Sequence, residues 1–286
     1  MMPDAGCYDR TVVPRRFDGR VVLVTGSTGI AAASAQRLAV EGASLVVASR
    51  TEAHCRSLVE AITSAGGTAS FEVADLLEDD AADRIVAATV GRHGRLDGVF
   101  HVAGGSGRRF GDGPAHAATP EGWDATLDLN ARTLFLVSSA ATRQMLSQDP
   151  DVDGQRGAIL HMASVTSTSP SPSYFATHAY AAAKGAVNAL TRTMASYYAP
   201  KGIRVNAVAP GVTRTPMAER AAGDPDIVAF ATWKQPLVGG LLDPDHVAGA
   251  AAFLLSRDAR AITGQVLDID AGWSVTDAPW RGPASQ

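Results

Sequence analysis

Short apolar segments alternate with helical patterns along almost the whole chain, and this alternation limits the possible fold more than any other sequence feature. It is typical of a parallel sheet, because each crossover between parallel strands needs a connection of about the size of a helix. The expected strands are residues 21–25, 44–49, 68–74, 97–103, 157–163, 203–209 and 264–270. The expected helices are residues 29–41, 52–65, 78–92, 120–147, 179–199 and 243–257.

The repeat continues without a linker, so we expect a single α/β domain over residues 19–286, preceded by an N-terminal arm over residues 1–18. Right-handed crossovers would make it a doubly wound Rossmann domain, with a parallel seven-stranded sheet and helices on both faces. Three irregular stretches, residues 104–117, 167–178 and 212–242, each follow a strand. They should gather at the carboxyl edge of the sheet, where such folds bind ligands.

Composition narrows the class of partner. The net charge of −4 argues against nucleic acid or an anionic membrane surface, and nowhere do 18 apolar residues run together. Neither Cys7 nor Cys55 has the spacing of a disulfide framework or a metal site. We therefore expect a cytoplasmic protein that binds a small molecule and no metal.

The segment YAAAK places a tyrosine and a lysine four residues apart in a run of alanines. Alanine favours a helix, which would set Tyr180 and Lys184 on one face about 6 Å apart along the axis. An ammonium about 5 Å from a phenol would supply about 3 of the roughly 4 kcal/mol needed to bring a tyrosine pKa from about 10 to about 7. Tyr197 and Lys201 share the spacing, but Pro200 between them should place that pair at a helix end.

The segment VVLVTGSTGIAAA reads as a strand, a glycine turn and a helix start. Gly26 and Gly29 would let a pyrophosphate approach the backbone amides at the positive end of the helix. The second strand ends in Ser49 and Arg50, where an NAD site would carry an acidic residue for the ribose hydroxyls. This favours NADP, with NAD as the alternative. Asp75, which closes the third strand, could reach the adenine or be an ordinary turn residue.

Together these residues resemble the short-chain dehydrogenase/reductase family from Arg20 to Trp273. The matching segments, in the order of the family, are VTGSTGIA (24–31), ADL (74–76), LDGVFHVAG (96–104), LDLNARTLF (127–135), ILHMASV (159–165), YAAAK (180–184), IRVNAVAPGVTRTPM (203–217) and ITGQVLDIDAG (262–272). The resemblance implies a catalytic tetrad of Asn130, Ser164, Tyr180 and Lys184. It implies a cofactor site of Gly26, Ser27, Thr28, Gly29, Ile30, Ser49, Arg50, Asp75, Leu76, Ala103, Gly104, Tyr180, Lys184, Pro210, Gly211, Val212 and Thr215.

Two departures from the family pattern concern the cofactor. Gly26 and Gly29 are separated by two residues where the family usually has three, and Ala31 replaces a third glycine, so the phosphate loop should be shortened. His101 and Val102 replace a pair of asparagines, which should remove an amide that braces the central sheet.

Other features concern the substrate. Ser164 precedes Tyr180 by 16 residues, more than is usual in the family, so the loop between them should reshape the pocket. We expect a lid at about residues 212–242 over a small apolar or aromatic substrate. The apolar residues of this lid are Met217, Phe230, Trp233, Leu237 and Leu241.

The resemblance implies an NADP-dependent ketoreductase, an oxidoreductase for a ketone or secondary alcohol. Tyr180 would be its general acid or base, Ser164 would donate a hydrogen bond to the substrate oxygen, and Asn130 would hold a water that relays protons to Lys184. Two alternatives stay open: a non-catalytic nucleotide-binding sensor or scaffold, and a lyase or epimerase without net redox change. The apolar helices at residues 120–147 and 179–199, like the family resemblance, favour a homodimer or homotetramer.

Overall fold

The computed structural model describes residues 15–276. All seven expected strands are present and form one parallel sheet in the order β3-β2-β1-β4-β5-β6-β7. Their bounds are β1 Val21–Thr25, β2 Ser44–Ser49, β3 Thr68–Val73, β4 Gly98–His101, β5 Gly157–Met162, β6 Ile203–Pro210 and β7 Val266–Ile269. The predicted fold is therefore confirmed.

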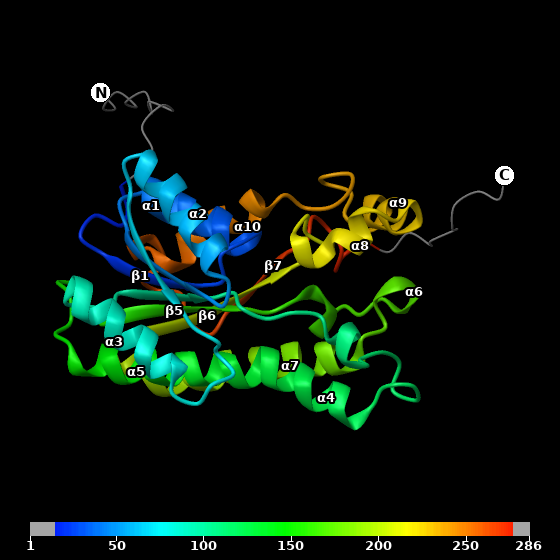
Figure 1. Ribbon diagram of the computed structural model, residues 1–286, viewed down its shortest axis with the longest axis horizontal. Coiled ribbons are helices and arrows are strands. Elements are labelled where there is room, and N and C mark those ends of the chain that lie inside the picture. The colour runs from blue at the N-terminus through cyan, green and yellow to red at the C-terminus, as the bar shows by residue number, and fades with distance from the viewer. Residues whose placement is uncertain (1–14, 277–286) are drawn as a thin grey trace, which may run out of the picture.

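Helices cover both faces of this sheet (Figure 1). On one face lie α1 (Ile30–Val40), α2 (Glu52–Ser64) and α10 (Pro244–Leu255). On the other lie α3 (Ala81–His93), α4 (Pro120–Leu127), α5 (Thr133–Ser147) and α7 (His178–Tyr198). The helix expected at residues 120–147 consists of α4 and α5 with one turn of π-helix, Asp128–Arg132, between them.

The hydrophobic core has two layers because the central strands are covered on both faces. Alternate side chains of β1 belong to different layers: Val22 and Val24 pack toward α1 and α10, while Leu23 packs toward α3 and α5. All of β1, β4, β5 and β6 is buried. This explains why these strands read as continuous apolar runs instead of alternating with polar residues.

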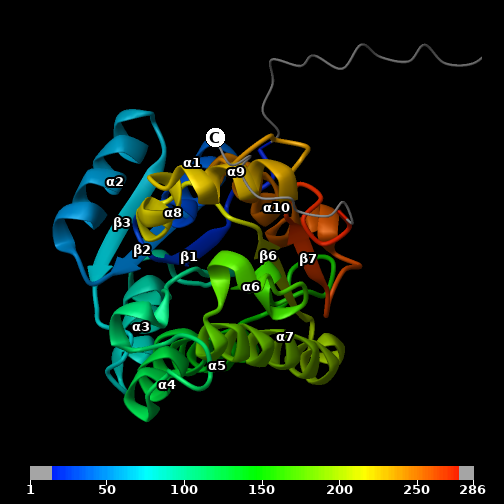
Figure 2. The ribbon, with the colours of Figure 1, turned by 90° about the vertical axis from the view of Figure 1, so that its right-hand side faces the viewer.

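The loops at the carboxyl edge of the sheet carry three short helices: α6 (Pro172–Phe175), α8 (Glu219–Ala222) and α9 (Pro225–Lys234). Figure 2 looks onto this edge and shows α8 and α9 above the sheet, with α6 near its middle. The long irregular stretches of the sequence thus meet at one end of the molecule, as their positions after strands predict.

The amino end of the described chain is packed against the domain. Phe17 is only 2% exposed, and the guanidinium of Arg16 pairs with the buried carboxylate of Glu41 at 2.6 Å. Arg16 and Phe17, in the last part of the expected arm, therefore contact the domain. Residues 1–14 lie outside the described residues. Within residues 15–276, no helix has the length and apolar character that crossing a membrane requires.

Candidate active site

A cavity of about 460 Å³ opens at the carboxyl edge of the sheet. Most of the residues that the sequence singles out line it. They are Gly26, Ser27, Thr28, Ile30, Ser49, Arg50, Asp75, Leu76, Ala103, Gly104, Ser164, Tyr180, Pro210, Gly211, Val212 and Thr215. Gly29, Asn130 and Lys184 are not among its lining residues.

The turn between β1 and α1 forms one end of this cavity. Gly26 has φ +100° and Gly29 has φ +55°, values that favour glycine. A Cβ on Gly29 would lie 2.8 Å from Cγ2 of Thr215, so the turn also needs glycine for space. No side chain of the described residues caps the start of α1. The shortened turn therefore still presents free backbone amides, together with the positive end of the helix, to an anionic group.

The end of β2 forms the neighbouring wall, with Ser49, Arg50, Thr51 and His54 lining the cavity. Arg50 lies 3.8 Å from the carboxylate of Asp75, and both side chains are well exposed. Such an open ion pair is weak, so the guanidinium can exchange this carboxylate for a phosphate. Thr51 and His54 are lining residues that the sequence did not single out.

Helix α7 carries Tyr180 and Lys184 on the face toward the sheet. The ammonium of Lys184 lies 5.5 Å from the ring centre of Tyr180 and donates a hydrogen bond of 2.8 Å to the carbonyl of Met162, at the end of β5. The stacked pair predicted by the helical spacing is therefore present. Lys184 is 3% exposed, and only the tyrosine faces the cavity.

Burial dominates the protonation of this pair. It lowers the pKa of Lys184 to about 7. It also raises the pKa of Tyr180, an effect that a hydrogen bond with Ser164 partly offsets. The expectation that Lys184 lowers the pKa of Tyr180 is thus wrong for this arrangement, because both groups lose water and each charged form is disfavoured.

In the second tyrosine and lysine pair, Tyr197 and Lys201, the pKa of the tyrosine shifts in the opposite direction. Tyr197 is 65% exposed, and Lys201 lies over its ring, so Pro200 does not prevent the contact. A hydrogen bond with Lys201 lowers the pKa of Tyr197. Neither residue lines the cavity, so position in the fold, and not spacing or pKa, distinguishes the two pairs.

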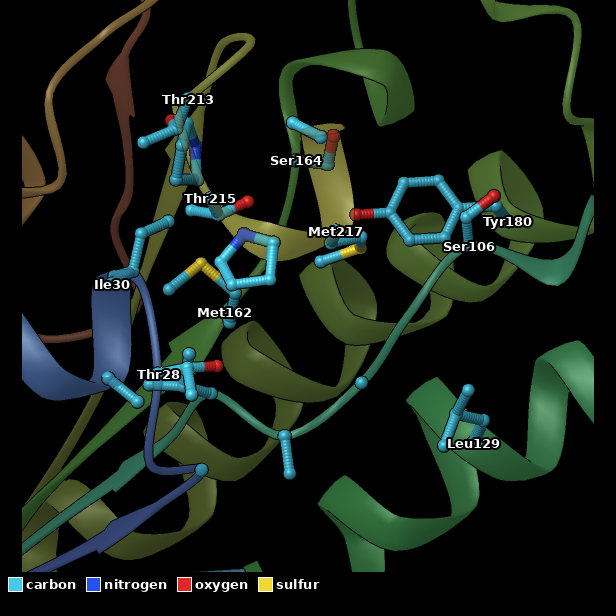
Figure 3. A pocket seen from close by; sticks show the side chains of 18 of the residues that line it. Thr28, Ile30, Ser106, Leu129, Met162, Ser164, Tyr180, Thr213, Thr215 and Met217 are labelled. Carbon is cyan, nitrogen blue, oxygen red and sulfur yellow. The ribbon is translucent and has the colours of Figure 1, made fainter. Parts of the chain in front are cut away.

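Ser164 follows β5 and lies beside Tyr180. Figure 3 shows the phenol oxygen of Tyr180 pointing into the cavity on the side of Ser164, with Met217 close by. The Ser164 hydroxyl is 2.9 Å from the hydroxyl of Thr166 and accepts a bond from the Thr166 amide. These contacts hold the serine at the end of the strand, where a substrate oxygen could meet both hydroxyl groups.

Asn130 lies in the π-helical turn and is 1% exposed. Its amide nitrogen donates to the carbonyls of Gly105 and Thr126, both at 2.9 Å, and its oxygen accepts from the Gly105 amide at 3.2 Å. The side chain therefore anchors the loop after β4. The expected role of Asn130 as holder of a relay water stays a prediction.

Asp112 is a residue of the site region that sequence reasoning missed. Its buried carboxylate accepts hydrogen bonds from the backbone amides of Ala179 and Tyr180, at 2.9 and 3.0 Å. The loop after β4 thus supplies the amino-terminal cap of α7, in place of the adjacent Thr177, whose side chain makes no capping bond. Capping from a residue so distant in sequence leaves no local motif that could have revealed it.

His101 replaces the missing asparagine brace. Its ring nitrogens lie 3.1 Å from the hydroxyl of Thr25 and 3.4 Å from that of Thr133. The Thr25 oxygen in turn accepts from the amides of Val102 and Ala103. The expected loss of bracing is therefore corrected, because an imidazole joins β1, β4 and α5 at this position.

Residues 212–242, expected to form a lid, make a lobe whose two ends are held together. Thr213 pairs with Leu242, and the amide of the buried Gln235 bonds the backbone of Val212 and Gly240. Met217 lines the cavity with its neighbours. The other apolar residues expected over the substrate do not line it.

Phe230, one of those residues, instead packs on Trp273, with ring centres 5.6 Å apart. Phe175 of the long loop after Ser164 joins the same cluster, 5.8 Å from Trp273, and lines the cavity. The lobe is therefore fixed by aromatic contacts to the turn that follows β7. The long loop contributes an aromatic wall to the cavity.

The sequence family described as "Enoyl-(Acyl carrier protein) reductase" matches residues 24–274. The short-chain reductase protein NovJ of Streptomyces niveus is 35% identical over 261 residues, covering 88% of this chain and 93% of its own length. The 3beta-hydroxysteroid dehydrogenase 1 of Eggerthella lenta is 35% identical over 259 residues, covering 90% and 94%.

Solved structures of similar sequence have the same fold. Levodione reductase superposes with a TM-score of 0.81 at 32% identity, covering 91% of this chain and all of that one. A short-chain type dehydrogenase/reductase from Mycobacterium ulcerans gives a TM-score of 0.82 at 30% identity, covering 92% of each chain. By sequence and by fold, this chain belongs to the short-chain dehydrogenase/reductase family and is an NAD(P)-dependent oxidoreductase of alcohol and ketone groups.

Proposed function

We propose that the protein is an NADPH-dependent reductase of a ketone, with Tyr180 as the acid that protonates the substrate oxygen. The observation that carries the proposal is the placement of Tyr180 and Ser164 on one cavity with the amino end of α1. NovJ, levodione reductase and the 3beta-hydroxysteroid dehydrogenase are named for reactions of this general type.

The residues at the cofactor end fit a dinucleotide. Gly26 and Gly29 leave room where a Cβ would crowd the turn, and the amides that start α1 face the cavity. Arg50 supports NADPH over NADH, because its guanidinium would pair with a 2'-phosphate and its exposed ion pair with Asp75 holds it loosely. The bound cofactor would supply the two electrons and the hydrogen that reduce the carbonyl carbon.

The chain's own residues would handle the oxygen. Ser164 would donate a hydrogen bond to the carbonyl oxygen, and Tyr180 would give that oxygen its proton. The raised pKa of Tyr180 keeps the phenol protonated at neutral pH, the form that can donate a proton to the substrate oxygen. Lys184, fixed by the Met162 carbonyl one helical turn away, would return a proton to Tyr180, since its pKa of about 7 lets it exchange protons near neutrality.

Two features of the cavity concern the substrate. The lobe at residues 212–242 would cover the substrate and exclude water, with Met217 on its inner side. Phe175 and Trp273 make that end of the cavity suited to an apolar or aromatic ketone.

We also propose that the protein forms a homodimer or homotetramer. Its cytoplasmic location stays a prediction.

The experiment compares two tyrosine-to-phenylalanine variants by the absorbance of NADPH with a panel of aryl ketones. Tyr180→Phe should lower kcat by about 10²- to 10⁴-fold, the usual contribution of a general acid. It should leave the Kd for NADPH, read from cofactor fluorescence, nearly unchanged. Tyr197→Phe is the matched control, because that tyrosine also has a lysine four residues later but lies outside the cavity. Equal turnover by the parent and Tyr180→Phe would reject the assignment.

A further inference from the structure

Two arginines from distant parts of the chain line the cavity and have not been assigned a role. Arg108 lies in a short 3-10 segment, η1 (Gly107–Phe110), after β4, and Arg220 lies in α8 of the lobe at residues 212–242. Neither has a carboxylate at ion-pair distance among residues 15–276. Arg132 and Arg143, by contrast, pair with Asp79 and Asp83 on the outer surface. The cavity therefore has two cations at its wall without an anion to balance them.

Arg108 is fixed at the substrate end of the cavity. Its Nη2 donates a hydrogen bond of 2.8 Å to the carbonyl of Tyr174, directly before Phe175 on the cavity wall. The cofactor-end arginine, Arg50, follows β2, which is separated from β4 by β1 in the sheet order. Arg108 thus lies beside Tyr174 and the adjacent Phe175, away from the expected adenosine end.

The charges of the two arginines act on each other. Burial, and after it the positive charge of Arg220, lowers the pKa of Arg108. Asp112 opposes this effect, but both oxygens of its carboxylate already accept the backbone amides at the start of α7. Bringing two guanidinium groups toward one cavity is unfavourable until an anion lies between them.

We propose that Arg108 and Arg220 form a subsite for an acidic group, a carboxylate, carried by the ketone substrate at the end away from its carbonyl. The inference rests on the proposed reductase function and specifies its substrate class. The planar fork of a guanidinium matches the two oxygens of a carboxylate, and arginines from η1 and α8 can approach it from opposite sides. Phe175 and Met217 would contact the apolar body of the substrate.

The test uses matched pairs of ketones that differ only in charge: 4-acetylbenzoate and 6-acetyl-2-naphthoate, each with its neutral amide. The parent should prefer the acids. Arg108→Gln and Arg220→Gln should each lower kcat/KM for the acids by about 10- to 100-fold, chiefly through KM, and leave the amides nearly unchanged. Arg109→Gln is the control, because Arg109 is exposed over the ring of Phe110 and does not line the cavity. Equal use of acid and amide by the parent would overturn the proposal.

A binding measurement separates this inference from the proposed reaction. The measurement is the rise in melting temperature that each acid and each amide produces at saturating NADPH. It is made on Tyr180→Phe and on the double variant that also carries Arg108→Gln. Acid-selective stabilisation that disappears with Arg108→Gln supports the subsite even if no ketone is turned over. If either arginine substitution instead weakens NADPH binding and affects acids and amides equally, the pair binds the cofactor's diphosphate and the proposal is wrong.

Discussion

Lys184 is buried and Tyr180 is half-buried at the cavity wall, and the loss of water around both groups decides their chemistry. Helix α7 places the two side chains on one face. Packing of this face against the sheet removes water from both. The lysine therefore has a pKa of about 7, and the phenol is a weaker acid than free tyrosine. The hydrogen bond and then the charge of Lys201 decide the pKa of the exposed Tyr197, whereas desolvation decides the pKa values of Tyr180 and Lys184.

The lowered pKa of Lys184 should be visible in stability. Above pH 7 the unfolded chain still binds a proton at this lysine while the folded chain releases it. The free energy of unfolding should therefore rise with pH up to the ordinary lysine pKa, by about 2 kcal/mol between pH 7.5 and 9. Lys184→Met should lack this rise. Chemical denaturation of both proteins at the two pH values measures the difference, and parallel pH profiles would contradict the burial effect.

Arg50 is predicted to select the cofactor. Arg50→Gln should raise the Kd for NADPH by about 10- to 100-fold, because a phosphate loses its charged partner, and should leave the Kd for NADH nearly unchanged. Arg56→Gln is the control, since Arg56 pairs with Glu52 on the exposed side of α2. Cofactor fluorescence titration measures both constants. A parent that binds NADH more tightly than NADPH would contradict the prediction.

At the scale of elements, helix α7 depends on a loop for its position. The carboxylate of Asp112 holds the amides of Ala179 and Tyr180, and the amide of His178 donates to the carbonyl of Gly113 at 3.2 Å. The loop after β4 therefore fixes the start of the helix that carries the proposed acid. Asn130 and His101 fix the same loop from its other side through Gly105 and Thr25.

Removing this cap should affect both stability and turnover. Asp112→Ala should lower the free energy of unfolding by about 1 to 2 kcal/mol and reduce kcat, because the amide of Tyr180 loses its anchor. Asp112→Asn, which keeps one acceptor, should recover part of both. Asp243→Ala is the control. Asp243 caps α10, which lies on the other face of the sheet from α7, so this substitution should cost similar stability and leave kcat unchanged. Equal kcat for the Asp112 and Asp243 variants would show that the cap does not position Tyr180.

At the scale of the whole molecule, one helical face carries exposed apolar side chains. Phe135 of α5 is 53% exposed, and Trp123 of α4 and Leu146 of α5 are 42% and 40% exposed. In a single chain this apolar surface would face water, and burying it against a second copy is favourable. The proposed dimer or tetramer would use this side of the molecule.

Phe135→Glu should shift the assembly toward a monomer, because a buried unpaired carboxylate in the contact is costly. Val40→Glu is the control, since Val40 is equally exposed at 53% but lies on α1, on the other face of the sheet. Sedimentation velocity at micromolar concentration distinguishes the species. Dissociation by Val40→Glu instead of Phe135→Glu would place the contact on the opposite face.

Sequence alone determined the elements of this protein and their order. The central strands are apolar runs and the helices between them repeat their apolar residues at helical spacing, so β1, α1 and the turn at Gly26 could be predicted from neighbouring residues. The Tyr180 and Lys184 spacing was equally local, because four residues make one helical turn.

Tertiary structure decided how these parts act. The cap from Asp112, the brace from His101 and the meeting of Arg108 with Arg220 join residues far apart in the chain, and no local pattern records such contacts. The pKa of Tyr180 moved against the sequence expectation for the same reason: spacing along a helix determines distance between charges, whereas the water removed around them depends on everything the fold packs nearby.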